Sequence, residues 1–418
     1  MSQAYLTAAQ MKAETGRCLN CPDKPCMKAC PANCSPADFI AAYKAGNLQK
    51  AAESVLKANP LGQMCGLTCP DRFCMTACSR RVLDAPVKIP AVQATILQKA
   101  RESGGIGAPS PVEANGLNVA VVGAGPAGAG AAAVLARKGC SVTVFESADK
   151  TGGAAKLIPE SRLPRAVIDA DWDFVQSLGD ISPVFNHRVA NPVDLLKDGY
   201  DGVIVAVGEP HGVTMGIPGE DLAVSFMDYL NTPEKYATTG NVAILGGGAT
   251  AVDCATTARE NGAENVEMFV RRRVCDMRLT DEERSWLFSK MIDVTSMTRV
   301  ERIDRTGDSF TLTTCKTRFN GTKLEDIPGT SIKRPDFALI VMAVGSRADP
   351  KLQAERVIYA GDCSHGGSTI VEAVASGKNA AEELLAALTG EIADAVCPVS
   401  RKVSVKAKSC AVLPGIEK

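Results

Sequence analysis

The chain has 418 residues, 46 basic and 47 acidic side chains, a formal net charge of −1 and a composition that is 45% hydrophobic with 37 glycines. This length predicts two to four domains, and the composition is typical of compact α/β layers. The near-neutral charge argues against a nucleic-acid partner, and no apolar run reaches the roughly 18 residues that span a membrane. The first residues lack the apolar core of a secretory signal, so we expect a cytoplasmic protein with no membrane partner.

Sixteen cysteines and only three histidines limit the possible chemistry. A disulfide framework is typical of small secreted domains and does not fit a long chain without an export signal. The three histidines are too few for a reaction built on imidazole bases. Their scarcity favours a reaction whose difficult step belongs to a cofactor.

Residues 1–105 alternate cysteine-rich loops with helical stretches at 39–43 and 48–56, which predicts a small helical domain. Eight of its cysteines fall into two tightly spaced groups, Cys18, Cys21, Cys26 and Cys30, then Cys65, Cys69, Cys74 and Cys78. Thiolates at this density hold either iron–sulfur clusters or zinc. Redox cofactor sites nearby would favour clusters, because zinc cannot accept electrons from a redox cofactor such as a flavin.

A Gly-, Pro- and Ser-rich linker at 101–117 leads to the apolar run 118–122, typical of a buried parallel strand. The run continues into a dinucleotide fingerprint, Gly123-Ala-Gly125-Pro126-Ala127-Gly128, which opens a helix at 127–138. Its glycines permit a tight turn, close approach of a pyrophosphate and close helix–strand packing. The next strand, 142–146, ends in Glu146, where a carboxylate would bind a ribose hydroxyl. We interpret this site as flavin-binding.

A second fingerprint follows the apolar run 241–245 and reads Gly246-Gly-Gly248-Ala249-Thr250-Ala251, with alanine in place of the third glycine. Its second strand, 266–270, ends in Arg271-Arg272-Arg273 rather than in an acid, and Arg278 follows closely. Guanidinium groups bind a ribose 2′-phosphate that a carboxylate would repel, although a solvated charge run is the simpler alternative. The placement at the strand end favours NADP(H) over NAD(H).

Near the C-terminus an apolar strand ends in Gly361-Asp362 and precedes a helix at 372–388, an arrangement that resembles the second FAD motif of two-dinucleotide flavoproteins. Two similar apolar runs, 203–208 and 339–345, indicate one nucleotide domain inserted within another. We therefore expect an FAD domain formed by 113–210 and 346–390, an NAD(P)H domain at 211–345 and a tail at 391–418 without usable periodicity. In the tail, the basic segment 401–408 is expected to be a solvated end rather than a docking site.

The combined pattern is specific. Cys18-x2-Cys21-x4-Cys26-x3-Cys30-Pro, then Asn-Pro-Leu-Gly at 59–62, the second cysteine group and the two fingerprints resemble one family over roughly residues 15–390. It is the module shared by the glutamate synthase small subunit and the N-terminal half of dihydropyrimidine dehydrogenase. The resemblance implies an α/β chain, an α-helical di-cluster iron–sulfur domain followed by two nested Rossmann-like domains. It also implies FAD, NADPH and two [4Fe–4S] clusters, with Gly153 and Arg162 as further FAD-binding residues.

By the same resemblance, one cluster would be held by Cys18, Cys21, Cys26 and Cys78, and the other by Cys30, Cys69, Cys74 and Gln93. Crossing of ligands between groups is reasonable, because the last cysteine of such a run often reaches a second cluster. Gln93 is the main reason to prefer the dihydropyrimidine dehydrogenase branch. Cys65 would then be spare, and Cys34 would be incidental, as would Cys140, Cys254, Cys275, Cys315 and Cys363. None of these later cysteines forms the CxxC pair that a disulfide reductase needs.

The predicted function is an NAD(P)H-oxidising subunit that passes electrons through FAD and two clusters to a partner. The partner would be an FMN-barrel subunit of the dihydropyrimidine dehydrogenase type. Alternatives are a glutamate synthase small subunit serving a large subunit, an electron-bifurcating ferredoxin:NADP oxidoreductase, and a redox-sensing or assembly protein without turnover.

Overall fold

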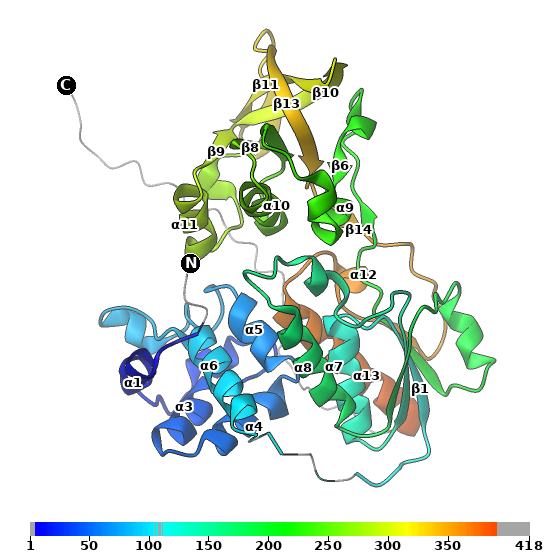
Figure 1. Ribbon diagram of the computed structural model, residues 1–418. Coiled ribbons are helices and arrows are strands. Elements are labelled where there is room, and N and C mark those ends of the chain that lie inside the picture. The colour runs from blue at the N-terminus through cyan, green and yellow to red at the C-terminus, as the bar shows by residue number, and fades with distance from the viewer. Residues whose placement is uncertain (1–4, 105, 108–109, 111, 391–418) are drawn as a thin grey trace. The chain divides into compact units, whose positions relative to one another are not determined.

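The computed structural model describes residues 5–104, 106–107, 110 and 112–390. These residues form two compact units (Figure 1): the first extends to His211 and resumes at Ser346, and the second extends from Gly212 to Gly345. The tail at 391–418, including the basic segment 401–408, lies outside the described residues. None of the helices in the described part of the chain has the length and apolar character needed to cross a membrane.

The first unit begins with a helical part. Its helices are α1 (Ala8–Gly16), α2 (Pro25–Lys28), α3 (Pro36–Lys44), α4 (Leu48–Ala58), α5 (Gly62–Thr68), the 3-10 turn η1 (Ser79–Val82) and α6 (Ile89–Glu102). A capping box formed by Thr7 and Gln10 starts α1, and the Asn47 side chain caps α4. One face of α4 is buried against α3 and α6 around Phe39 and Leu97.

The rest of the first unit is a five-stranded parallel sheet in the order β15-β4-β1-β2-β3. Its strands are β1 (Asn118–Val122), β2 (Ser141–Phe145), β3 (Ile181–Val184), β4 (Gly202–Val205) and β15 (Val357–Tyr359). Helices α7 (Pro126–Arg137), α8 (Arg165–Gln176) and α13 (Ile370–Thr389) contribute to its main core. Three short elements complete it: η2 (Gly153–Leu157), η3 (Pro192–Leu196) and α12 (Asp362–His365).

Helices α7 and α13 approach each other at their backbones. A Cβ atom on Gly130 would lie 2.4 Å from the Val374 carbonyl oxygen, and one on Gly377 would lie 1.9 Å from the Ala127 carbonyl oxygen. No side chain fits between backbones at these distances, so the crossing requires glycine at both positions. The crossing fixes α13 on the flavin fingerprint helix.

The helical part docks on this sheet domain through a buried polar contact. The Asp171 carboxylate on α8 has no exposed surface, accepts a hydrogen bond from the Met64 amide at 2.8 Å and pairs with Arg101 of α6 at 2.5 Å. Burial raises the pKa of Asp171, while the charge of Arg101 acts in the opposite direction. Because Met64 lies on α5, this carboxylate joins three helices of the first unit.

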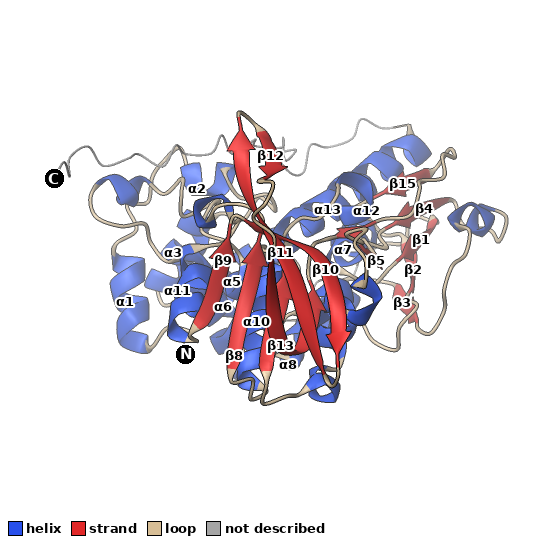
Figure 2. Ribbon diagram, turned by 90° about the horizontal axis from the view of Figure 1, so that it is seen from above, coloured by secondary structure: helices blue, strands red, loops and turns tan. Residues whose placement is uncertain are grey.

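The second unit is built on a mixed sheet in the order β10-β11-β13-β7-β8-β9, whose edge strand β10 is visible in Figure 2. The strands are β6 (Val224–Ser225), β7 (Asn241–Leu245), β8 (Asn265–Val270), β9 (Ile292–Ser296), β10 (Thr298–Thr306), β11 (Ser309–Asn320), β12 (Lys323–Asp326) and β13 (Ile332–Met342). Strands β13, β7, β8 and β9 are parallel, whereas β10, β11 and β13 are antiparallel. Its helices are α9 (Phe226–Asn231), α10 (Ala249–Glu260) and α11 (Asp281–Ser289), with the 3-10 turns η4 (Glu220–Leu222), η5 (Pro233–Tyr236) and η6 (Val274–Asp276). Strands β5 (His211–Gly212) and β14 (Ser346–Arg347) form a separate two-stranded sheet.

Replacing Gly377 with Ala tests the α7–α13 crossing. In an unobstructed helix the change would be favourable by about 1 kcal/mol, but here the new methyl group meets the Ala127 carbonyl. We expect the free energy of unfolding of the first unit to fall by about 1–3 kcal/mol, measured by urea denaturation with flavin release as the signal. Gly16→Ala, where nothing lies within 4 Å of the new methyl group, is the control and should not destabilise. Equal stability of the two variants would contradict the crossing.

Candidate cofactor sites and cysteine groups

Four cysteines from two separate parts of the sequence line one pocket. Cys18 follows α1, Cys21 and Cys26 come from the α2 region, and Cys78 comes directly before η1. The pocket encloses about 380 Å³ of empty space, part of it open to solvent. Cys21 Sγ lies 3.4 Å from Ser79 Oγ, and burial raises the pKa of Cys26 to about 11. The structure thus brings together the four cysteines that the resemblance assigns to one cluster.

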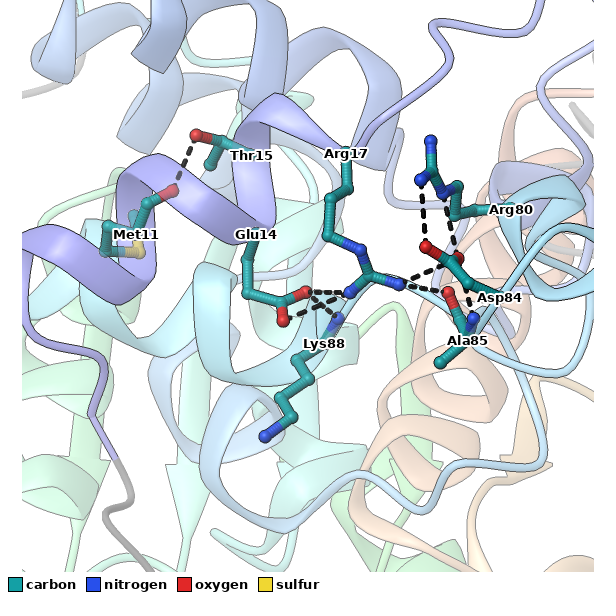
Figure 3. A network of polar contacts seen from close by, with 8 residues as sticks. All are labelled: Met11, Glu14, Thr15, Arg17, Arg80, Asp84, Ala85 and Lys88. Carbon is teal, nitrogen blue, oxygen red and sulfur yellow. Dashed lines mark hydrogen bonds and ion pairs between the residues drawn. The ribbon is translucent and has the colours of Figure 1, made fainter.

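A polar network restrains the segments at both ends of this pocket (Figure 3). The Arg17 guanidinium pairs with Glu14 at 3.0 Å and with Asp84 at 3.1 Å, and Asp84 also pairs with Arg80 at 2.8 Å. The backbone amide of Lys88 donates to Glu14 at 3.0 Å. The hydrogen bonds of Asp84, first of all those from Arg80, hold the pKa of its carboxyl below the usual range.

This network matters because of its neighbours in sequence. Arg17 immediately precedes Cys18, and Arg80 comes two residues after Cys78. One carboxylate, Asp84, therefore ties the segment carrying the first cysteine of the set to the segment carrying the last.

A second set of cysteines, called here the second sulfur group, consists of Cys30, Cys34, Cys65, Cys69 and Cys74. It contains two more cysteines than the sequence predicted for the second cluster. Cys30 and Cys34 share a hydrogen bond, Cys65 and Cys69 share another, and Cys74 is close enough for its charge to act on Cys69. The contact with Cys34 lowers the pKa of Cys30, whereas the contact with Cys65 raises the pKa of Cys69. Cys34 and Cys65 were expected to be incidental and spare. Each lies four residues from a predicted ligand, Cys34 from Cys30 in a turn and Cys65 from Cys69 at the end of α5, and this spacing is the signal that could have included them.

Gln93 is buried on α6, and its amide nitrogen donates to the Gly62 carbonyl at 2.6 Å. Gly62 begins α5, the helix that carries Cys65, and a Cβ on Gly66 would lie 2.7 Å from the Ala94 amide. Gln93 therefore lies at the close contact of α5 and α6, and its described contact is with backbone rather than with a thiol. Among the described residues no three His, Cys, Asp or Glu side chains could hold a single metal ion. A cluster makes a different demand, because each ligand binds its own iron.

The first fingerprint forms the turn between β1 and α7. Gly123 has φ +109°, and a Cβ there would lie 2.5 Å from the Ala206 carbonyl oxygen. A Cβ on Gly128 would lie 1.9 Å from the Gly123 carbonyl oxygen. Because β1 lies between β2 and β4, this turn is at the point where the strand order reverses, which is where open α/β sheets bind ligands.

Glu146 follows β2 and is buried beside this turn. Its carboxylate accepts hydrogen bonds from the Ala124 amide at 2.9 Å and the Ala148 amide at 2.8 Å. The loop before η2 also closes on the turn, since a Cβ on Gly153 would lie 2.8 Å from the Gly125 Cα atom. Glu146 and Gly153 are thus both brought to the fingerprint.

The C-terminal motif meets the same place. A Cβ on Gly361 would lie 2.7 Å from the Ala127 Cβ atom, in the first turn of α7. The Asp362 carboxylate accepts a hydrogen bond from Ser368 Oγ at 2.5 Å, and burial raises its pKa. Arg162 lies in the turn between η2 and α8, where its amide donates to the Pro159 carbonyl. The structure therefore places the Gly361-Asp362 motif against the start of the fingerprint helix.

In the second unit, Gly246 forms the turn after β7 with φ +146°, and a Cβ there would lie 2.2 Å from the Ala343 carbonyl oxygen. Gly248 caps α10, and nothing lies within 4 Å of the position that a Cβ would take on it. Ala249 and Thr250 form the first turn of α10, and Ala251 is fully buried. The α10 N-terminus is thus open at Gly248, as phosphate binding requires.

The arginines after β8 differ from one another. Arg273 pairs with Asp276 at 2.8 Å and stacks over the Phe319 ring at 5.2 Å. Arg271, Arg272 and Arg278 are exposed, and their side chains have no ion pair within residues 112–390. The three guanidinium groups predicted to bind phosphate are therefore available to a ligand.

Comparison with known families agrees with this arrangement. The family described as pyridine nucleotide-disulphide oxidoreductase matches residues 117–377, more than half of the chain. The family described as dihydropyrimidine dehydrogenase domain II, 4Fe-4S cluster, matches residues 1–105. The chain belongs to the pyridine nucleotide-disulphide oxidoreductase family and carries a 4Fe–4S domain at its N-terminal end.

Individual relatives add to this picture. The NAD-dependent dihydropyrimidine dehydrogenase subunit PreT of Escherichia coli (strain K12) is 29% identical over 410 residues, which cover 92% of this chain and 95% of the relative. The NADPH-Fe(3+) oxidoreductase subunit beta of Geobacter sulfurreducens (strain DL-1 / KN400) is 30% identical over 282 residues, 64% of this chain and 42% of that relative. The structure of Mycobacterium tuberculosis FprA in complex with NADPH has a TM-score of 0.56 at 16% identity, and the match covers 68% of this chain and 86% of FprA. FprA supports the fold alone.

The chain is therefore an NAD(P)H-dependent flavoprotein oxidoreductase with iron–sulfur clusters, and its function is electron transfer. The predicted α/β fold with a helical iron–sulfur domain is confirmed, as is the predicted family resemblance. The cluster interpretation of the N-terminal cysteines is confirmed over zinc, because the matching family is a 4Fe-4S family.

Replacing Asp84 with Asn tests the network at the first cysteine pocket. Loss of the charge that ties Arg17 to Arg80 should let the Cys18 and Cys78 segments separate more easily. We expect about half of the bound iron to be released several-fold faster than in the wild type. The absorbance of an iron chelator measures this release. Asp308→Asn, an exposed change in the turn between β10 and β11, is the control. Release at the control's rate would contradict a positioning role for Asp84.

Proposed function

We propose that this chain is the NADPH-oxidising subunit of a dihydropyrimidine dehydrogenase-like complex, passing electrons through FAD and two [4Fe–4S] clusters to a separate acceptor subunit. The observation that carries the proposal is the position of α13. Its first residues, Ile370 and Val371, pack against Ala32 and against Cys65 of the second sulfur group, while the same helix follows the Gly361-Asp362 motif. One helix thus adjoins both the flavin motif and a cysteine group.

The proposed site residues are those named from the sequence. Clusters would be bound by Cys18, Cys21, Cys26 and Cys78, and by Cys30, Cys69, Cys74 and Gln93. FAD would be bound by Gly123, Gly125, Pro126, Ala127, Gly128, Glu146, Gly153, Arg162, Gly361 and Asp362. NADPH would be bound by Gly246, Gly248, Ala249, Thr250, Ala251, Arg271, Arg272 and Arg278. The corresponding domains are 1–105 for the clusters, 113–210 with 346–390 for FAD, and 211–345 for NADPH.

When bound, the flavin accepts hydride from the nicotinamide and the clusters carry electrons singly. The protein binds and orients these groups. The N-terminus of α7, at which Gly125 makes no side-chain cap, provides amide donors and partial positive charge for a pyrophosphate. The Glu146 carboxylate, held by two backbone amides, is positioned for a ribose hydroxyl. No acid–base dyad is needed, in agreement with three histidines in the whole chain.

Coenzyme choice is proposed to depend on the arginines after β8. Arg271 and Arg278 are exposed and unpaired within residues 112–390, whereas Arg273 is already held by Asp276. PreT is named NAD-dependent, and the Geobacter sulfurreducens relative is named for NADPH. The relatives thus include both coenzymes, and the free guanidinium groups favour NADPH here.

The acceptor is proposed to be another polypeptide in the cytoplasm. PreT is named as a subunit, and this chain covers 95% of it. An FMN-barrel subunit recovered with the native protein would support the dihydropyrimidine dehydrogenase branch. A glutamate synthase large subunit, or ferredoxin reduction coupled to a second acceptor, would assign the chain to one of the other two branches.

Replacing Arg271 and Arg278 together with Gln tests the coenzyme assignment. Loss of charge-assisted hydrogen bonds to the 2′-phosphate should raise KM for NADPH by about tenfold or more and leave KM for NADH nearly unchanged. Steady-state dye reduction with each coenzyme measures both. Arg188→Gln, an exposed change in the first unit, is the control. An equal loss with the two coenzymes would contradict the phosphate role.

Replacing Cys26 with Ser tests the electron path. The wild-type chain, isolated without oxygen, should hold one FAD and about eight irons with as many labile sulfides, as two [4Fe–4S] clusters require. The variant should hold about half of this iron, and its flavin should still be bleached by NADPH. Cys275→Ser, at an exposed position, should keep the full content. Zinc in place of iron and sulfide, or a colourless wild-type protein, would overturn the proposed function.

A further inference from the structure

Lys378 is a buried cation that the proposed electron path does not yet use. It lies on α13, is 5% exposed, and its ammonium donates to two carbonyl oxygens of the helical part, Ala32 at 3.0 Å and Ala58 at 2.5 Å. Ala58 ends α4, and Ala32 follows Cys30 by two residues. A lysine of the flavin-binding part thus reaches the backbone that surrounds the second sulfur group.

The Ala32 peptide connects Lys378 to sulfur. Its carbonyl accepts the hydrogen bond from Lys378, and its amide donates to Cys30. Lys378 is also close enough for its charge to act on the Cys30 and Cys34 thiols. The lysine therefore lies near the second sulfur group and is linked to Cys30 through one peptide group.

The neighbouring backbone holds Lys378 in place. Gly377, the preceding residue, contacts the Ala127 carbonyl at the α7–α13 crossing, and Val371 packs with Ala32 and Cys65. A side chain anchored on both sides cannot move its charge away from the sulfurs without separating these contacts.

In the part of the chain that the structure describes, no carboxylate pairs with the charge of Lys378. Within residues 5–104 and 112–390 it has no ion pair, and its two described acceptors are neutral carbonyls. Burying an ammonium group without a negative partner is costly, so such a group is retained where a negative charge compensates it. A [4Fe–4S] cluster with three or four thiolate ligands is negatively charged in both oxidation states, and one-electron reduction adds one more negative charge.

We propose that Lys378 is a positioning residue whose fixed positive charge makes reduction of the cluster at the Cys30 group more favourable. The inference rests on the proposed function, because it needs that cluster. Net charge and hydrogen bonds around the sulfurs are the means by which a protein sets a cluster's potential. A cation near this cluster would favour its reduction by the flavin.

Three variants test this proposal. In each variant both clusters undergo a redox titration, and electron paramagnetic resonance monitors their reduction. Lys378→Met removes the charge and keeps the length of the side chain. Lys378→Gln removes the charge and keeps an amide donor for the buried carbonyls. Lys378→Arg keeps the charge. The cluster at the Cys18 group, in the same molecule, is the internal control.

For Met and Gln we expect the equilibrium constant for reduction of the second cluster to fall by about tenfold or more, which is 59 mV for one electron. The Arg variant should stay near the wild type, and the first cluster should not change. Loss of the second cluster in Met and Gln but not in Arg would also support the charge role. Unchanged potentials in Met and Gln, equal shifts in all three variants, or loss of the cluster in all three would overturn it.

Failure of the proposed function would look different. Wild-type protein without a second cluster, shown by iron and sulfide analysis, would remove the proposed function itself. Two clusters in the wild type, with potentials that do not depend on Lys378, would contradict this inference but not the proposed function.

Discussion

The backbone contact between α7 and α13 is the constraint on which most of the first unit depends. Two glycines, Gly130 and Gly377, let the helices cross with carbonyl groups against Cα atoms. The crossing places the Gly361-Asp362 motif at the first turn of the fingerprint helix. Because α13 also carries Val371 and Lys378 into the helical part, the same contact positions the flavin motif relative to the second sulfur group.

The charged residues of this chain have two different roles. Asp84 pairs with two arginines and holds together the segments at the first cysteine pocket. Asp171 pairs with Arg101 and joins the helical part to the sheet domain. Arginines after β8 are split in the same way, since Arg273 is held by Asp276 while Arg271 remains available to a ligand. The paired charges hold parts of the fold together, whereas Arg271, which has no ion pair within residues 112–390, can bind an anion.

Local patterns predicted the elements around the fingerprints well. The apolar run 118–122 is β1, the run 241–245 is β7, and the helix expected at 127–138 is α7 at 126–137. The antiparallel strands β10, β11 and β12 were not predicted from the sequence. Their outer positions are exposed, so polar and charged residues such as Arg302 and Lys316 interrupt the apolar pattern that marks a buried strand.

The sequence by itself determined the cofactor class, because glycine spacing, a strand-terminal Glu146 and the cysteine spacings each answer a local chemical demand. Only the tertiary structure decided which distant groups meet. It placed Cys78 beside Cys18, added Cys34 and Cys65 to the second sulfur group, and brought Lys378 to that group across the helical part. Such contacts join residues far apart in the chain, and no local periodicity encodes the packing of one helix against another.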